Sequence, residues 1–138
     1  FQASAGTPVY AGEDGFVREI NTSQVATWGY NIVLEHSHPA GGKFTTVYWH
    51  VNPIPGIVVA PSGQSLTFVP KGMQIGTVAN LGSNTHFHLG VRNGVYVLNV
   101  SGTGALPQQT CTDPNGVTYP AMPAGFIDPN STSNVLFN

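Results

Sequence analysis

The sequence predicts a mostly β fold followed by a long irregular tail. Short apolar runs alternate with turn residues over about the first 100 positions, and no window of helical length shows the 3.6-residue period of an amphipathic helix. Seventeen Gly and 11 Pro favour many turns and few helices. The 138 residues, 41% of them hydrophobic, are enough for one domain with a core.

The expected strands are rich in β-branched and aromatic residues and are bounded by Gly, Pro, Asn or Ser. In chain order they are TPVYAG (7–12), GFVREI (15–20), YNIVLEH (30–36), KFTTVYWHV (43–51), IVVAPSG (57–63), LTFVPKG (66–72), MQIGTVA (73–79), THFHLGVR (85–92) and VYVLNV (95–100). We predict hairpins between the first two, between the third and fourth, and across Asn93-Gly94 between the last two.

From Ser101 onward the chain changes character, because Pro, Gly, Thr and Asn replace the alternating apolar runs. We therefore predict a domain over residues 1–100 and an irregular arm over residues 101–138 that packs on the domain or trails from it. A flexible linker to another domain is the alternative. The single cysteine, Cys111, is either a free thiol or paired outside this chain.

The composition excludes several classes of function. Only 7% of the residues are charged, four of them Lys or Arg, and the net charge is -2. Nucleic acid and anionic membrane surfaces both need clustered basic residues, so neither is an expected partner. No apolar run reaches the length of about 18 residues that crosses a bilayer. Low charge with many Asn, Thr and Ser favours an extracellular or envelope location.

The segment NTHFHLGV (84–91) contains the first candidate site. Residues two apart on a strand share a face, so His86 and His88 point the same way. Phe87, Leu89 and Val91 then point to the opposite face, which we expect to be core. Histidine is both a common metal ligand and the side chain best suited to proton transfer near neutral pH.

A third histidine extends this pattern. In TTVYWHV (45–51), Thr46, Tyr48 and His50 are expected on one face, with Val47 and Trp49 on the other. If this strand and the H-x-H strand are neighbours, three imidazoles converge. The alternative is a solvated strand face that happens to carry histidines.

His36 and His38 form a second H-x-H pair, which raises the possibility of a cupin-type metal site. That pattern also requires a Glu a few residues after its first pair, and HSHPAGGK (36–43) has none. His38 precedes Pro39 in an expected turn, and His36 closes an apolar strand. We therefore expect His38 to be exposed and His36 to be structural.

The order of these motifs resembles the lysostaphin-like (LytM-type) zinc endopeptidases of bacterial cell walls. The matching segments are AGTPVYAGEDGFV (5–17), NIVLEHSHPAGGKFTTVYWHV (31–51) and VPKGMQIGTVANLGSNTHFHLGV (69–91). The resemblance covers roughly residues 5 to 92. It implies an antiparallel β-sheet sandwich of that type built around one zinc ion.

The same resemblance implies roles for the histidines. His88 matches a zinc ligand, His86 matches a histidine that acts as a base or stabilises the transition state, and His50 matches the remaining catalytic histidine. His36 matches a position with no catalytic role. The family takes two further ligands from an upstream H-x-x-x-D motif, whose Asp would stand immediately before Phe1. Asp113 or Asp128 could substitute for them only geometrically.

Two functions from different classes follow from the resemblance. The first is a zinc endopeptidase that hydrolyses peptide bonds in the stems or cross-links of peptidoglycan. The second is a catalytically inactive relative that serves as a binding or regulatory module of the envelope. An adhesion or carbohydrate-binding module would explain the composition but not the three histidines. Many relatives have Gly-Pro where this chain has Asn84-Thr85, which leaves the bond cleaved open.

Overall fold

The computed structural model describes residues 1–21 and 30–97 and the strand residues 111–112, 118–119 and 126–127. Its elements are β1 (Pro8–Tyr10), β2 (Gly15–Asn21), β3 (Tyr30–Ser37), β4 (Lys43–Pro53), β5 (Phe68–Val69), β6 (Gln74–Val78), the 3-10 turn η1 (Gly82–Asn84), β7 (His88–Asn93), β8 (Cys111–Thr112), β9 (Thr118–Tyr119) and β10 (Phe126–Ile127). No helix among the described residues has the length and hydropathy to cross a membrane.

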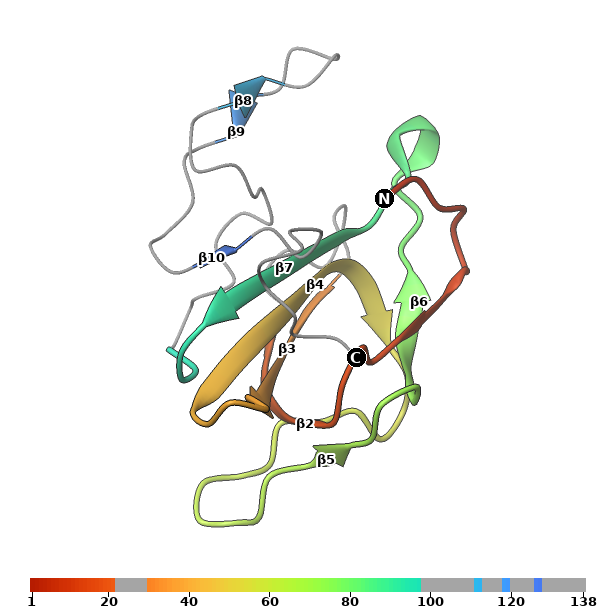
Figure 1. The fold of residues 1–138 in the computed structure, drawn as a ribbon. Coiled ribbons are helices and arrows are strands. Elements are labelled where there is room, and N and C mark those ends of the chain that lie inside the picture. Colours follow the sequence, from red (N-terminus) through yellow and green to blue (C-terminus); the bar gives the residue numbers. More distant parts are fainter. Residues whose placement is uncertain (22–29, 98–110, 113–117, 120–125, 128–138) are drawn as a thin grey trace.

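The strands form one curled antiparallel sheet in the order β1-β6-β4-β3-β2-β5, with β7 added at β4 and β10 added at β7 (Figure 1). β8 and β9 form a separate pair. β4 is the central strand, because β3 occupies one of its edges while β7 and then β6 occupy the other. The predicted mostly β, antiparallel fold is therefore confirmed, and so is the hairpin of β3 and β4.

The curled sheet has apolar residues on both faces of its central strands. The main core includes Ile32 and Leu34 of β3 and Tyr48 of β4. Val33 alternates with the first two and packs on the other face with Val47 and Trp49. Burial on both faces explains why the sequence of β3 is a continuous apolar run rather than an alternating one.

Two glycines are required by close contacts within the sheet. A Cβ at Gly15 would lie 2.6 Å from His36 Nδ1, and one at Gly76 would lie 2.4 Å from Val51 Cγ1 and 2.5 Å from Asn52 O. Real Cβ atoms do not approach other atoms so closely. Close packing therefore explains why glycine follows Asp14 and Ile75 in the sequence.

The predicted hairpin between residues 7–12 and 15–20 is wrong. β1 pairs with β6, whereas β2 pairs with β3 and β5. The acidic segment between β1 and β2 makes a long-range contact instead of a tight turn. Asp14 Oδ1 accepts a hydrogen bond from Lys71 N at 2.7 Å, and Gly72 N donates to Ala11 O at 2.9 Å.

The predicted hairpin across Asn93-Gly94 is also wrong over residues 94–97. β7 ends at Asn93, and the following residues do not form a strand. Tyr96 is held by two carboxylates, since its N–H donates to Glu35 Oε2 (2.7 Å) and its hydroxyl donates to Glu19 Oε2 (2.8 Å). These bonds direct the chain across β2 and β3, away from the path of a hairpin.

The arm over residues 101–138 lies mostly outside the described residues, and its packing stays a prediction. Asp113 and Asp128 belong to that part. The backbone of Cys111 is described in β8, but its side chain is not. The pairing of its thiol also stays a prediction.

Candidate metal centre

The H-x-H motif lies where β7 begins, and its side chains alternate as predicted. Phe87 and Leu89 pack against the main core, and Val91 is buried against Phe44. His86 and His88 therefore project from the opposite face, with their ring centroids 4.6 Å apart. Both rings are partly exposed.

β4 and β7 are neighbours, as the convergence of the histidines requires. Residues directly opposite each other in a ladder share a face. The register sets Trp49 opposite His88 and Tyr48 opposite Leu89. Trp49 thus lies on the histidine face and Tyr48 on the core face. The predicted alternation of Tyr48 with Val47 and Trp49 is confirmed, but the prediction that the face of Tyr48 carries the histidines is wrong. Strict alternation would also direct His50 toward the core.

A β-bulge reverses the direction of His50. The register with β3 passes from Asn31↔Trp49 to Tyr30↔Val51, so His50 is the extra residue of the bulge. Its φ is +61°, and it alone among the described residues other than glycine has a positive φ. Bulges redirect side chains and are frequent beside active sites. Here the bulge brings the imidazole of His50 to the face of His86 and His88.

The bulge also marks a branch point in the sheet. One edge of β4 pairs with β7 as far as Trp49 and with β6 from Val51 onward. Ala79 N, just beyond β6, donates to His50 O at 2.7 Å. The branch point therefore fixes the backbone of His50 on both sides, which is how a strained φ can persist.

The result is a cluster of three imidazoles, here named the histidine cluster: His50, His86 and His88. The ring of His50 lies 4.8 Å from that of His86 and 5.1 Å from that of His88, centroid to centroid. One nitrogen from each ring lies within 4.8 Å of the others, so the cluster could hold a metal ion. The predicted convergence of these residues is confirmed as geometry.

The three histidines of the cluster differ in solvent exposure. His50 is 5% exposed, and the ring of Trp49 meets its ring edge-on at 5.8 Å. Burial fixes the position of the His50 ring, whereas the other two rings remain partly accessible. A ligand would therefore approach from the side of His86 and His88.

The loop before β7 orients His86. Its Nδ1 lies 2.5 Å from the carbonyl oxygen of Asn84. A carbonyl can only accept, so Nδ1 carries the proton and Nε2 has the lone pair. Thr85 stiffens the loop, because its Oγ1 donates to Gly82 O (2.8 Å) and accepts from Leu81 N (3.0 Å). This role of Asn84 could not be predicted from its residue type, because the contact is made by its backbone carbonyl.

The start of the chain adds a segment to the other edge of the H-x-H motif. Phe1 and Phe87 exchange two backbone hydrogen bonds of 2.7 and 2.9 Å, and their rings stack at 5.5 Å. Gln2 forms an antiparallel bridge with His86. Phe1 and Gln2 therefore lie beside the H-x-H motif, next to the histidine cluster.

His36 is not part of the cluster. It is 1% exposed, its Nδ1 donates to Asp14 O at 2.8 Å, and its Nε2 accepts from Thr46 Oγ1 at 2.7 Å. Burial lowers the pKa of His36, an effect that the hydrogen bond to Asp14 O opposes. The side chain of His38 accepts from Ala40 N in the turn after β3. The two H-x-H pairs therefore do not form one cupin-type site, and the expected structural role of His36 agrees with these contacts.

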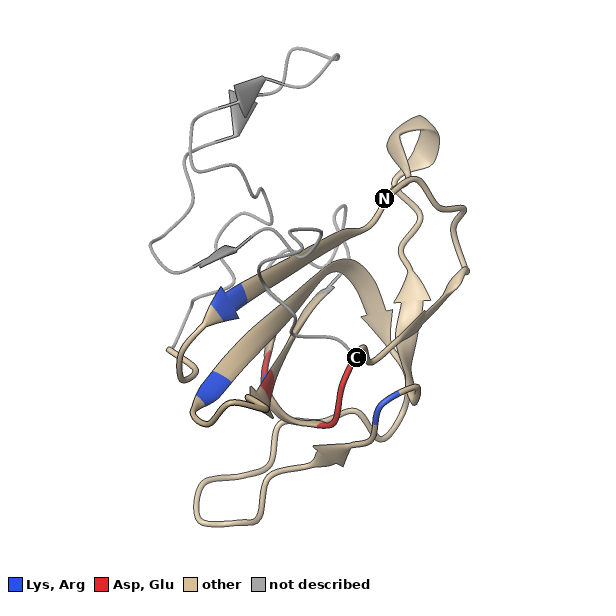
Figure 2. Ribbon diagram, in the orientation of Figure 1, with Lys and Arg blue, Asp and Glu red and all other residues tan. Residues whose placement is uncertain are grey.

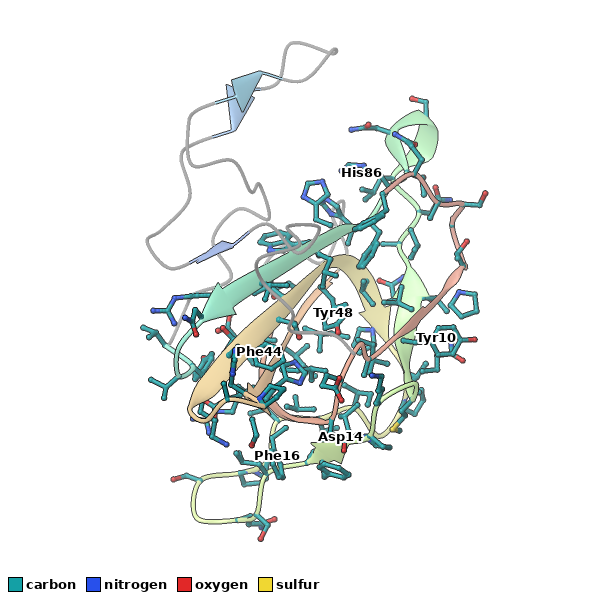
Figure 3. The ribbon with its side chains drawn as sticks, viewed as in Figure 1. Tyr10, Asp14, Phe16, Phe44, Tyr48 and His86 are labelled. Atoms are coloured by element: carbon teal, nitrogen blue, oxygen red, sulfur yellow. The ribbon has the colours of Figure 1, made fainter. Side chains whose placement is uncertain are left out.

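The histidine cluster lies away from the charged side chains of the described residues. Figure 2 shows the Lys, Arg, Asp and Glu segments toward the other end of the sheet, near the turn between β3 and β4 and the loop before β6. His86 is at the opposite end (Figure 3). In residues 1–21 and 30–97, the site thus offers imidazole nitrogens without a carboxylate, a donor set suited to zinc.

Comparison with known proteins adds one finding. The model of a family described as Peptidase family M23 matches residues 1–100. The match includes all of β1 to β7 and the whole histidine cluster. No curated protein matches the chain at a significant level.

Proposed function

Because the chain belongs to peptidase family M23, a family of metallopeptidases, we propose that it is a zinc endopeptidase acting on peptidoglycan peptides. The observation that carries the proposal is the convergence of His50, His86 and His88, which requires a bulge with a strained backbone at His50. The proposed location is the bacterial envelope or the extracellular space.

The size of the cluster supports a metal site. Two nitrogens bound to one tetrahedral zinc at about 2.05 Å lie about 3.3 Å apart. The nitrogens of the cluster lie within 4.8 Å of one another. The three rings are therefore close enough to share one metal-centred site, and the division into one ligand and two neighbours is taken from the family motif. Bound zinc would supply Lewis acidity toward the scissile carbonyl and a lowered pKa for water.

We assign His88 as the ligand, and His86 and His50 as the catalytic histidines. The assignment of His88 rests on the family motif and on the N-terminal register. A carboxylate immediately before Phe1 would lie opposite His88 and could share its metal. We expect this carboxylate, and a histidine four positions earlier, to complete the ligand set.

The catalytic roles follow from the environments of the two rings. His86 holds its proton on Nδ1 against Asn84 O, so its Nε2 is ready to take a proton from an attacking water. His50 is buried and fixed beside Trp49, so it is suited to donate a hydrogen bond to the developing oxyanion. Each role needs a fixed ring rather than a mobile one.

The test uses the protein in its full encoded length. We expect about one zinc per chain by mass spectrometry and release of new amino termini from purified peptidoglycan. His88→Ala should lose the zinc. His86→Ala should keep the zinc and lose about 10²–10⁴-fold in rate. His38→Ala, in the turn after β3, is the matched control and should keep both.

The outcome that overturns the proposal is equally clear. If the protein in its full encoded length binds no zinc and releases no amino termini, it is not an endopeptidase of this kind. The alternative of an inactive envelope module then takes its place, and retention on intact peptidoglycan would be its positive sign.

A further inference from the structure

A concave site lies at the end of the sheet opposite the histidine cluster. It is a cavity of about 480 Å³. Its lining includes Glu13, Asp14, Phe16, Ser37, Phe68 and Lys71. Ser37 pairs with Lys43 at the start of β4, and from there to His50 the strand rises about 23 Å at 3.3 Å per residue. Figure 3 shows Asp14 and Phe16 far from His86.

An exposed aromatic pair forms one wall of this cavity. Phe16 and Phe68 are directly opposite each other on β2 and β5. Their ring centroids are 5.4 Å apart, and 36% and 52% of these residues are exposed. Their strand neighbours Val17 and Val69 supply the core on the other face. The outer face of this ladder thus presents apolar rings to solvent beside a cavity, as binding surfaces do.

The same cavity is also lined by fixed acidic, basic and hydroxyl groups. Lys71 Nζ donates to Glu13 Oε2 at 3.1 Å, and Asp14 Oδ1 is fixed by Lys71 N at 2.7 Å. Ser37 Oγ accepts from Lys43 Nζ at 3.3 Å. The carboxylates outnumber the lining ammonium group, so an anionic ligand is disfavoured. A ligand with neutral hydroxyl or amide groups can both donate to the carboxylates and accept from Lys71.

We propose that this cavity binds a saccharide. A pyranose ring has an apolar C–H face that matches Phe68 and Phe16, and a rim of hydroxyls that matches Glu13, Asp14 and Lys71. The volume suits one or two sugar rings rather than a large partner. That the sugar belongs to a peptidoglycan strand rests on the proposed function, whereas saccharide binding itself does not.

The experiment is a titration of the ¹⁵N-labelled full chain with the β-1,4-linked trimer of N-acetylglucosamine, in zinc-free buffer. We expect saturable shifts of the amides of Gly15, Phe16 and Phe68. Phe68→Ala should weaken binding at least about tenfold, and Phe68→Tyr, which keeps an aromatic face, should stay within about twofold. Tyr10→Ala is the control, because Tyr10 is 54% exposed on β1 and does not line the cavity.

Three results would overturn the proposal. They are the absence of shifts at these amides, equal weakening by Phe68→Ala and Tyr10→Ala, and shifts caused by lysinamide but not by the trimer, which would indicate an amine site. His88→Ala should leave trimer binding unchanged. A failure of the metal centre and a failure of the saccharide site are therefore separately visible.

Discussion

The bulge at His50 can be tested by comparing two substitutions that both remove the imidazole. A residue with a Cβ in the left-handed region costs about 1–2 kcal/mol, and glycine does not carry this cost. Glycine loses about 0.5–1 kcal/mol relative to alanine through its more flexible unfolded chain. At φ +61° the first effect is larger. His50→Gly should therefore be more stable than His50→Ala by about 0.5–1 kcal/mol.

The matched control is Thr45, which is fully buried on the same strand and has no left-handed backbone. There the order should reverse, with Thr45→Ala more stable than Thr45→Gly by about 0.5–1 kcal/mol. Urea unfolding of the four variants measures both differences, and Tm should follow with shifts of ~2–4 °C. If His50→Ala equals or exceeds His50→Gly in stability, the backbone at His50 is not left-handed and the account of the convergence fails.

Three further predictions concern the framework around the site. Gly15→Ala should lower the free energy of unfolding by about 1–3 kcal/mol, because the added methyl group would overlap His36. In a double-mutant cycle with His36→Ala, the two effects should be strongly coupled. Additive effects would show that the two residues are not in contact. The pKa of His36 is lowered in the folded chain, so the unfolded state binds more protons below about pH 6.5. The contribution of His36 to the free energy of unfolding should therefore be constant above pH 6.5 and should decrease as the pH is lowered from 6.5 to the pKa of the folded state. The variant His36→Gln should lack this decrease. If the pH dependence is the same in His36→Gln, the assignment to His36 is refuted. Tyr96→Phe should cost about 1 kcal/mol through the lost bond to Glu19, and thermal unfolding that matches the parent chain would show that the bond does not matter.

The parts of the site that follow from side-chain alternation could be predicted from the sequence. The alternation of His86, Phe87 and His88 settles which side chains are core and which face the site, because an apolar side chain between two histidines has only one favourable face. His36 could be set aside as structural because it ends an apolar run. These features depend on local order alone.

The prediction that His50 converges with the other two histidines was correct, but the bulge that causes the convergence cannot be deduced from the sequence. Alternation along β4 assigns His50 to the face of Tyr48, and the register shows that this is the core face. Only the bulge restores the convergence. A histidine in a left-handed conformation has no sequence signature, because glycine or asparagine is the expected residue there.

The missed hairpins have a similar origin in long-range contacts. Glu13-Asp14-Gly15 and Asn93-Gly94 are both strong local turn signals. In the fold, the side chain of Asp14 accepts a hydrogen bond from Lys71 N, and Tyr96 donates hydrogen bonds to the carboxylates of Glu19 on β2 and Glu35 on β3. Contacts between residues 57 or more positions apart cannot be deduced from local propensity.

The most direct test of the metal centre is a crystal structure of the protein in its full encoded length, grown with zinc and measured with anomalous scattering at the zinc edge. We expect one anomalous peak within about 2.0–2.1 Å of a ring nitrogen of His88, with the rings of His50 and His86 facing its remaining position and a carboxylate from immediately before Phe1 as a second ligand. A peak elsewhere, or none near His88 at full zinc saturation, would contradict the central claim.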